Sequence, residues 1–402
     1  MIFEYQIFNL HYFERCNYMD RNSYLNDIKY AFEVHPIVAI LGPRQVGKTT
    51  LAQNYAKEHG VNFLTNYFDL ESLQDFSPLN SPEATLSLLK GLIVIDEVQL
   101  LPDLFPRLRV LIDKFSATQK YLLLGSASRE LVQNSSESLA GRIQYIECFP
   151  FSYSEVKNIE VLWLRGGFPK AYLQSDDYKA FVWLENYIRS FLERDIPALG
   201  IRLPTMEIRR FWYMLAHYHG QELNYSDLAV SLSLSHTTLK RYIDLLSATL
   251  IIRQLQPWYQ NIGKRQVKSP KLYFRDSGIF HQMLGINSLA QLIHNPKLGA
   301  SFEGFVIEEI IKHYKIRPED AFFWKVHSGA EIDLLLLYKG KKIGFEIKYS
   351  DKPILTNSLK VAAEILKLDQ AFLIYRGEKT INLAPNIIAL SLQNLLDNYD
   401  LN

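Results

Sequence analysis

The sequence predicts an α/β fold whose N-terminal part is a parallel sheet. Four apolar runs alternate with segments of helical periodicity: residues 37–41, 63–68, 92–95 and 121–124. Such alternation is typical of a parallel sheet with helices on both faces. A glycine-bounded loop follows the first run, and two carboxylates follow the third. After the loop, a helix pattern begins at Thr50 and is closed by Gly60 at its C-cap.

Length and composition limit the class of protein. The chain has 402 residues, which suggests about two to four domains. Its 48% apolar content is typical of a globular protein, and its net charge of +1 provides no global field toward nucleic acid or membrane. With only Cys16 and Cys148, no apolar run near ~20 residues and no basic N-terminal cluster, we expect a cytoplasmic protein without membrane contact.

A phosphate-binding loop follows the first apolar run. The motif G-x-x-x-x-G-K-[ST] is formed by Gly42, Pro43, Arg44, Gln45, Val46, Gly47, Lys48 and Thr49, and Thr50 continues into the helix. In such loops backbone N–H groups approach phosphates, and the helix N-terminus adds partial positive charge. We expect Lys48 to reach the β- and γ-phosphates and Thr49 to bind Mg²⁺. The alternative is a chance glycine-rich turn.

Two carboxylates end the third apolar run. Beside a phosphate-binding loop, Asp96 is expected to bind Mg²⁺ directly or through water. Glu97 is expected to orient or deprotonate the attacking water. The alternative is an acidic loop at a strand end. The two motifs together predict ATP and Mg²⁺ as cofactors.

Polar residues near the last strands of the sheet complete the expected site. Ser126 ends the fourth run and is expected to contact the γ-phosphate or the water, because ligands bind beyond the carboxyl ends of parallel strands. Ser128 competes for this role, and a helix N-cap before Glu130 is the alternative for either serine. Arg142 precedes a strand-like segment and is expected to stabilise the transferring phosphoryl group, in cis or from a neighbouring subunit; the alternative is a surface arginine.

Residues 19 to about 380 resemble bacterial and archaeal AAA-type ATPases with a C-terminal DUF4143 region. The motifs that carry the resemblance are GPRQVGKTTLA at 42–52, LIVIDEVQLLPDL at 92–104, LLLGSAS at 122–128, SLAGR at 138–142, GGFP at 166–169, KLYFRDSG at 271–278 and FEGFVIEE at 302–309. The resemblance implies an AAA-type P-loop core with Ser126 near the sensor position. It also strengthens the expectation that Arg142 contacts the γ-phosphate.

The segment 222–274 has the pattern of a winged helix. A short helix from residue 222, a turn at 232–235 and a second helix at 236–246 form a helix-turn-helix, and residues 248–255 and 271–274 are expected to form the strands of a wing. His236, Thr237, Lys240 and Arg241 are expected to face outward and to contact DNA, unless the module only packs against protein. A basic cluster follows and is most simply a solvated loop: Lys264, Arg265, Lys268 and Lys271.

A β-hairpin is predicted near the C-terminus. Strands at 331–338 and 343–348 flank a turn at 339–342. Centring the turn between Gly340 and Lys341 pairs Asp333 with Lys348 and makes Asp333 and Glu346 diagonal neighbours on one face, within reach of a shared cation. Glu303 or Glu308 from the preceding helix is expected to add a ligand.

This arrangement resembles the PD-(D/E)xK nuclease core over roughly residues 299–380. Asp333, Glu346 and Lys348 match the motif, whereas Ile332 stands where the motif has proline. The resemblance implies a restriction-endonuclease-like α/β domain, and cation-dependent cutting of branched or duplex DNA is one expectation. The alternative is a hairpin whose polar face forms Asp–Lys pairs, because fold does not establish activity.

Changes of pattern divide the chain into expected segments. These are an extension or N-terminal helix at 1–18, the ATPase core at 19–150, a helical connector or lid at 151–218, the winged helix at 219–285 and the nuclease-like domain at 286–402. The expected function is ATP hydrolysis coupled to binding of DNA or of another protein, in a chain that can form a homo-oligomer. The alternatives are an ATP-gated switch with an inactive nuclease-like domain and an ATP-dependent, structure-selective nuclease.

Overall fold

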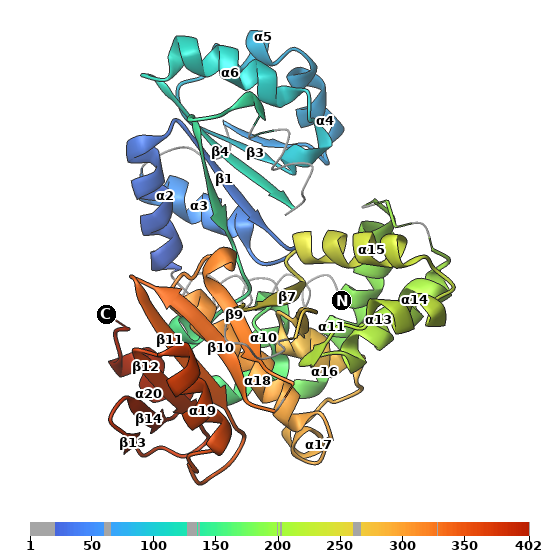
Figure 1. Ribbon diagram of the computed structural model, residues 1–402. Coiled ribbons are helices and arrows are strands. Elements are labelled where there is room, and N and C mark those ends of the chain that lie inside the picture. The colour runs from blue at the N-terminus through green and yellow to red at the C-terminus, as the bar shows by residue number, and fades with distance from the viewer. Residues whose placement is uncertain are drawn as a thin grey trace. The chain divides into compact units, whose positions relative to one another are not determined.

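A computed structural model of the protein divides into two compact units (Figure 1). The structure describes residues 21–59, 66–126, 135, 137–198, 200–201, 203–259, 267–327 and 329–401. The first unit holds the described residues up to Pro150 together with Ala248–Leu250, and the second holds the rest. Several expectations lie outside the described residues: those for residues 1–18, Gly60, Ser128, Lys264 and Arg265.

The first unit is built on a five-stranded sheet in the order β2-β3-β4-β1-β5, and all its neighbours pair in parallel. The strands are β1 (Ile37–Gly42), β2 (Tyr67–Asp69), β3 (Gly91–Asp96), β4 (Gln119–Ser126) and β5 (Ile143–Glu147). The central segments of β1, β3 and β4 are fully buried and rich in β-branched residues and leucine, as expected for strands covered on both faces. The predicted α/β fold with a parallel sheet is therefore confirmed.

Helices cover both faces of this sheet (Figure 1). They are α2 (Asn22–Val34), α3 (Lys48–Glu58), α4 (Leu73–Phe76), η2 (Ser77–Asn80), α5 (Pro82–Leu86), η3 (Val98–Leu100) and α6 (Leu104–Phe115). Side chains of α6 such as Leu108 and Leu111 form one core with Ala39, Ile93 and Leu123 of the strands. The packed sheet holds the carboxyl ends of β1, β3 and β4 at one edge.

The second unit contains a nine-stranded mixed sheet in the order β13-β14-β12-β11-β10-β9-β7-β8-β6. The strands are β6 (Gln221–Glu222), β7 (Ile252–Pro257), β8 (Lys271–Phe274), β9 (Ala321–Lys325), β10 (Glu331–Tyr338), β11 (Lys341–Ile347), β12 (Gln370–Ile374), β13 (Ile381–Ala384) and β14 (Ile387–Leu390). Strands β7 and β9 pair in parallel at Gln256 and Pro257. The sheet thus continues from the segment expected as a winged helix into the segment expected as nuclease-like.

Helices make up most of the remainder of the second unit. They are α8 (Tyr153–Val156), α9 (Ile159–Arg165), α10 (Pro169–Tyr172), α11 (Asp177–Ser190), the π-helix η4 (Phe191–Asp195), α12 (Ile196–Ala198), α13 (Thr205–His217), α14 (Tyr225–Ser231), α15 (His236–Ala248), α16 (Ser277–Met283), α17 (Leu289–Ile293), α18 (Leu298–His313), η5 (Pro318–Asp320), α19 (Asn357–Leu366) and α20 (Leu392–Asn398). Helix α18 is buried on all sides from Ser301 to Ile311 except at Glu303. A helix buried all round is typical of the centre of a domain.

The C-terminal hairpin has a different register from the expected one. Strands β10 and β11 pair Tyr338 with Lys341 and Leu335 with Gly344, so the loop contains only Lys339 and Gly340. Both loop residues have positive φ, 50° and 80°, which is the two-residue turn whose twist suits a hairpin. The predicted pairing of Asp333 with Lys348 was therefore wrong by two residues. Because the shift is even, each side chain keeps its face of the sheet.

Within the part of the chain that the structure describes, no helix is long and apolar enough to cross a bilayer.

Candidate functional site

The loop after β1 is shaped by two glycines for different reasons. A Cβ on Gly42 would lie 2.2 Å from the carbonyl oxygen of Cys148, so only glycine lets β1 approach the chain that leaves β5. Gly47 has φ +93°, a left-handed conformation that glycine adopts without steric cost, immediately before α3. The loop therefore turns sharply into a helix N-terminus, the arrangement that presents N–H groups to an anion.

Lys48 is buried at the start of α3. Its Nζ donates to the carbonyl oxygens of Gly42 and Pro43, at 3.0 Å each. Burial lowers the pKa of Lys48, although the carboxylates of Glu97 and Asp96 partly oppose that effect. The ammonium group is thus held over the loop itself, where a phosphate on the loop would be within its reach.

The two expected Mg²⁺ ligands lie side by side. Thr49 Oγ1 donates to Asp96 Oδ2 at 2.6 Å, which brings the start of α3 to the end of β3. The Tyr67 hydroxyl donates to the same carboxylate oxygen at 3.0 Å, and burial, together with the charge of Asp96, raises the pKa of Tyr67. A hydroxyl and a carboxylate are suitable oxygen ligands for Mg²⁺, so these residues fit the expected ion.

Glu97 follows β3 in a left-handed backbone conformation with φ 53°. Its carboxylate accepts a hydrogen bond from the side-chain amide of Gln99, and the amide oxygen of Gln99 accepts from the backbone N–H of Ser126 at 3.2 Å. The hydroxyl oxygen of Ser126 is buried and has no hydrogen-bond partner among the described residues. Gln99 therefore ties the end of β3 to the end of β4, and sequence reasoning missed it.

Arg142 lies away from this edge of the sheet. Its backbone carbonyl accepts from Ile37 N at 3.1 Å, which places Arg142 level with the first residue of β1, about 16 Å along the strand from Gly42. Its guanidinium pairs with Asp113 at 2.9 Å. The expectation that Arg142 contacts the γ-phosphate in cis was wrong, because a residue preceding a parallel strand lies at the amino edge.

Two further arginines lie near the loop. Arg44 is partly exposed and forms an ion pair with Glu71 at 3.5 Å. Arg21 is buried and donates to the carbonyl oxygens of Val46 at 3.1 Å and Phe149 at 2.7 Å. Arg21 thus joins the phosphate-binding loop, at Val46, to the chain that follows β5. Nothing in the local sequence pattern indicates this, because its partners lie 25 and 128 residues away.

A second polar cluster lines a cavity of about 610 Å³ in the second unit. The predicted residues Glu303, Asp333, Glu346 and Lys348 all line it, together with Glu222, Lys271, Lys325 and Glu331. Lys348 Nζ lies 3.4 Å from Glu346 Oε1 and 3.8 Å from Asp333 Oδ2. Asp333 sits at a break in register between β9 and β10, and such irregularities often redirect side chains near sites.

Buried charges in this cavity have shifted pKa values. Burial raises the pKa of Glu303, and the neighbouring Asp333 raises it further. Burial also raises the pKa of Glu346. For Lys348, burial would lower the pKa, but Asp333 and Glu346 outweigh it and the pKa is raised. The cavity thus combines two carboxyl groups of raised pKa, Glu303 and Glu346, with lysines that hold their charge. Burial would also raise the pKa of Glu331, but Lys271 and Lys325 outweigh it and the pKa is lowered.

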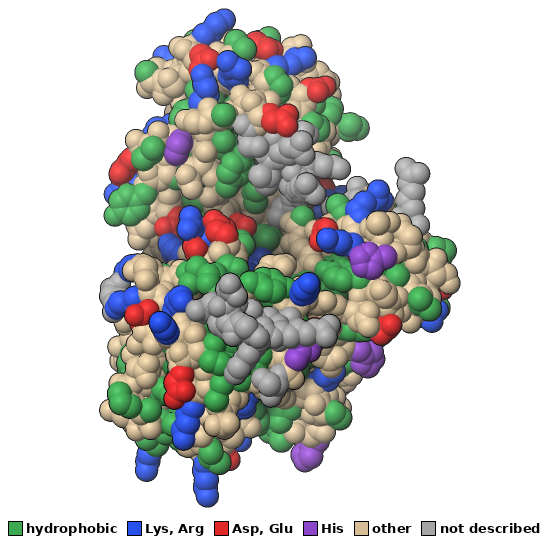
Figure 2. All heavy atoms as spheres, viewed as in Figure 1, with side chains coloured by type: hydrophobic (Ala, Val, Ile, Leu, Met, Phe, Trp, Pro, Cys, Tyr) green, Lys and Arg blue, Asp and Glu red, His purple; other side chains and the backbone are tan. Residues whose placement is uncertain are grey.

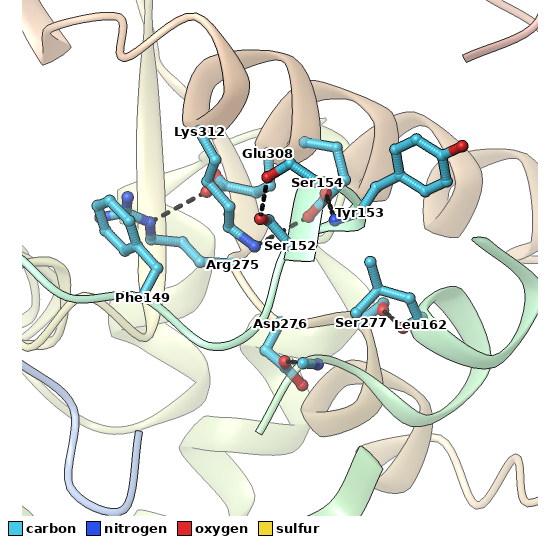
Figure 3. A network of polar contacts seen from close by, with 12 residues as sticks. Phe149, Ser152, Tyr153, Ser154, Leu162, Arg275, Asp276, Ser277, Glu308 and Lys312 are labelled. Carbon is cyan, nitrogen blue, oxygen red and sulfur yellow. Dashed lines mark hydrogen bonds and ion pairs between the residues drawn. The ribbon is translucent and has the colours of Figure 1, made fainter. Parts of the chain in front are cut away.

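Glu308, the alternative to Glu303, points elsewhere. Arg253 donates to its carboxylate. Arg275 Nε donates to the same carboxylate at 3.1 Å (Figure 3). Burial alone would raise the pKa of Glu308, but the two guanidiniums hold it at about 2. Close by, Asp276 Oδ2 accepts from Gly167 N at 2.7 Å, so the GGFP and KLYFRDSG segments are packed together. These residues form a structural network rather than part of the cavity.

The residues expected to contact DNA are exposed on α15. His236, Thr237, Lys240 and Arg241 all lie on its accessible side, and basic side chains with a histidine gather over α15 in Figure 2. The expected solvated basic loop needs a correction, because the Lys271 side chain is only 5% exposed and lines the cavity from β8. Lys268 remains exposed.

The fold and the loop after β1 define a P-loop ATPase with an AAA domain. Family models match an AAA domain at residues 34–157, a domain of unknown function (DUF8612) at 156–290 and a domain of unknown function (DUF4143) at 298–395. The chain belongs to the family of AAA-domain P-loop ATPases with a C-terminal DUF4143 region.

Relatives extend over nearly the whole chain. Uncharacterized proteins of Mycobacterium bovis and Mycobacterium tuberculosis are each 41% identical over 383 residues, covering 95% of this chain and 86% of the relative. Among solved structures, a Walker-type ATPase of Pyrococcus abyssi is 16% identical, covers 67% of this chain and 97% of its own, and has a TM-score of 0.45.

Proposed function

We propose that the protein hydrolyses ATP with Mg²⁺ and couples its nucleotide state to binding of DNA. The observation that carries the ATPase proposal is the 2.6 Å contact between Thr49 and Asp96, beside the Lys48 ammonium. These three groups come from the ends of β1 and β3, which lie on either side of β4 in the sheet, and converge at the phosphate-binding loop.

Each residue has a distinct role in this proposal. Backbone N–H groups of the loop and Lys48 bind the phosphates, and Thr49 with Asp96 holds the ion. Mg²⁺, when bound, neutralises charge on the β- and γ-phosphates. Glu97 takes a proton from the attacking water, and Gln99 orients its carboxylate through the hydrogen bond between them. The buried hydroxyl of Ser126 contacts the γ-phosphate or the water.

The order of elements in the second unit supports DNA as the partner. Helix α13, strand β6, helices α14 and α15 and strands β7 and β8 follow one another, and β8 pairs with both β6 and β7. This is the order of a winged helix, in which the third helix contacts DNA. The exposed residues of α15 include Lys240 and Arg241, and lysine and arginine are residue types that bind phosphates and base edges.

Between the two alternatives for the C-terminal region, we favour a domain that does not cut DNA. Asp333, Glu346 and Lys348 share one cavity, as a nuclease requires, but Lys271 shares it with them. Lys271 lies 3.2 Å from Glu303 Oε1 and 2.5 Å from Glu331 Oε1. A lysine paired with these carboxylates opposes binding of the cation that cutting needs.

Turnover measurements on the full chain test the proposal. We expect Glu97→Gln to keep ATP binding and to reduce phosphate release by about 10²-fold or more, the scale of a lost general base. The Lys48→Ala variant should lose both ATP binding and phosphate release. Unchanged turnover in Glu97→Gln would overturn the assignment of Glu97, and wild-type ATP binding by Lys48→Ala would overturn the phosphate site.

DNA coupling is tested separately with the same assay. Single-stranded, duplex and branched DNA are added to the wild type and to the double variant Lys240→Ala and Arg241→Ala. We expect at least one DNA to change ATP turnover in the wild type and to have a weaker effect on the variant. Turnover that no DNA changes would contradict the DNA proposal and favour a switch that binds another protein.

A further inference from the structure

The cavity in the second unit contains the carboxylates that a cation site needs, but other groups of the protein already bind their oxygens. A divalent cation such as Mg²⁺ needs several oxygen ligands at about 2.0–2.1 Å, with lone pairs free to coordinate. Asp333 Oδ2 already accepts from the backbone N–H of Ile347 at 2.8 Å, and Glu346 Oε2 accepts from the Thr356 hydroxyl at 2.7 Å. In the described part of the chain, no group of three or more Asp, Glu, His or Cys residues is arranged to hold a metal ion.

Lys271 lies among the carboxylates. Its Nζ is 2.5 Å from Glu331 Oε1, 3.2 Å from Glu303 Oε1 and 3.9 Å from Asp333 Oδ1. The side chain is 5% exposed, so water screens these interactions little. Glu303 is also fixed by the Tyr273 hydroxyl, which donates to the same oxygen at 2.5 Å. One ammonium group thus contacts oxygens of α18 and β10 together.

We infer that Lys271 occupies the place of a divalent cation in this cavity, so that the native chain binds neither Mg²⁺ nor Mn²⁺ there. The site expected for a nuclease-like domain is therefore neutralised by the chain's own lysine. The inference goes beyond ATP hydrolysis, since no residue of the phosphate-binding loop takes part. It also explains why a buried lysine is tolerated: a buried charge is stable only when it is paired.

The lysine and its partners come from different regions of the family. Lys271 belongs to the DUF8612 match at residues 156–290, whereas Glu303, Glu331 and Asp333 belong to the DUF4143 match at 298–395. The shared sheet brings them together, because β7 pairs with β8 on one side and with β9 on the other. The ion pairs of Lys271 thus join two regions of one compact unit.

Removal of the lysine should create the site that the native chain lacks. In Lys271→Met the carboxylates keep their positions on α18 and β10 but lose the compensating charge. Such a change destabilises a protein because Glu303 is left buried without its ion pair, while Glu331 keeps Lys325 at 3.2 Å and Asp333 keeps Lys348 at 3.8 Å. A divalent cation that binds there restores the balance, so binding and stability should change together.

The experiment counts Mn²⁺ bound to the nucleotide-free full chain, with free Mn²⁺ measured by its electron paramagnetic resonance signal. The proteins compared are the wild type, Asp333→Asn, Lys271→Met, Lys271→Arg and the double variant Lys271→Met with Asp333→Asn. Any Mn²⁺ at the phosphate-binding loop is common to all five and cancels. We expect Lys271→Met alone to bind one additional Mn²⁺ per chain, and Mn²⁺ to raise its melting temperature more than that of the wild type.

Two results would overturn the inference. One is a Mn²⁺ that the wild type binds and Asp333→Asn loses, since the native cavity would then be a cation site. The other is a folded Lys271→Met that gains no Mn²⁺. If Lys271→Met does not fold, the comparison of the wild type with Asp333→Asn still decides whether the native cavity takes a cation.

Discussion

The side-chain amide of Gln99 donates a hydrogen bond to the carboxylate of Glu97, from a position only two residues further along the chain. Gln99 lies in the short helix η3, and its amide oxygen accepts from Ser126 N on β4. Glu97 itself has φ 53°, a conformation that costs a non-glycine residue roughly 1–2 kcal/mol. Strained residues of this kind cluster at functional sites, and here Gln99 fixes the side chain that the strained backbone presents.

Gln99 is predicted to be a positioning residue for hydrolysis. Gln99→Ala removes the hydrogen bond but no charge, so kcat should fall by about 10–100-fold, because small misplacements of a catalytic group are costly. The KM for ATP should stay within about twofold, since phosphate binding depends on other residues. Steady-state kinetics of phosphate release measure both quantities.

Gln99→Glu is the matched control for this prediction. It keeps the length of the side chain but replaces the amide donor with a carboxylate beside Glu97, so kcat should fall at least as far. A rise in kcat in Gln99→Ala would mean that the bond restrains Glu97 rather than orients it. Wild-type kinetics in both variants would leave Gln99 without a role.

Arg142 is predicted to be dispensable for hydrolysis within a single chain. It lies at the amino edge of the sheet and forms a surface ion pair with Asp113, a contact worth about 1 kcal/mol or less. Arg142→Ala should therefore keep its fold, its ATP affinity and its turnover per chain when the protein is dilute. Turnover is measured over a range of protein concentrations, with sedimentation to report association.

A neighbouring subunit is the remaining way for Arg142 to reach a nucleotide. In that case wild-type turnover per chain increases with protein concentration and that of Arg142→Ala does not. Loss of turnover in an Arg142→Ala chain that stays monomeric would contradict the prediction.

Local patterns predicted the elements of the fold but not the distant contacts. The strands β1, β3 and β4 were found because buried parallel strands are continuous apolar runs, as in residues 37–41. The hairpin register was missed because the residue types at 339–342 are compatible with either a two-residue or a four-residue turn. The position of Arg142 was available from the sequence, since a residue that precedes a parallel strand lies at its amino edge.

No local sequence pattern predicted the contacts of Arg21 and Lys271. Lys271 meets Glu303 and Glu331 from 32 and 60 residues away, through strands whose neighbours depend on the whole sheet. A buried lysine and an exposed one look alike in a basic stretch. The Thr49–Asp96 contact was predictable because two motifs with a known spatial relation carry it.

Arg21 is predicted to stabilise the phosphate-binding loop. Arg21→Ala removes the hydrogen bonds from the guanidinium to the carbonyl oxygens of Val46 and Phe149, and a hydrogen bond to a charged group contributes about 1.5–3 kcal/mol. We expect a lower melting temperature and about 10-fold weaker ATP binding, since Val46 belongs to the loop. Equilibrium binding of a fluorescent ATP analogue measures the second effect.

Arg21→Lys separates charge from geometry. A lysine keeps the charge but lacks the planar fork that reaches two carbonyl groups at once, so its ATP affinity should lie between those of the wild type and Arg21→Ala. If Arg21→Ala binds ATP as tightly as the wild type, the loop does not depend on this support.

His219 is predicted to make the protein less stable in mild acid. The ring is fully buried; its Nδ1 accepts from Phe274 N at 3.0 Å, so Nε2 carries the proton and donates to Ala300 O at 3.1 Å. Burial lowers the pKa of His219 to about 3 and that of His281 to about 4. Protonation of Nδ1 would place two N–H groups against each other.

The sign of the pH effect follows from these values. An unfolded histidine has a pKa of about 6.5, so between that value and the folded pKa the unfolded chain binds more protons, and stability falls as the pH falls. Each histidine should remove about 1.6 kcal/mol of unfolding free energy between pH 6.5 and pH 5. Urea denaturation at several pH values measures the slope.

The His219→Gln variant provides the comparison. Glutamine does not titrate, so this variant should be less stable than the wild type at pH 7 but should lose less further stability on acidification to pH 5. The double variant with His281→Gln should have the flattest pH dependence. Parallel pH profiles for the wild type and both variants would show that the buried histidines do not cause the acid sensitivity.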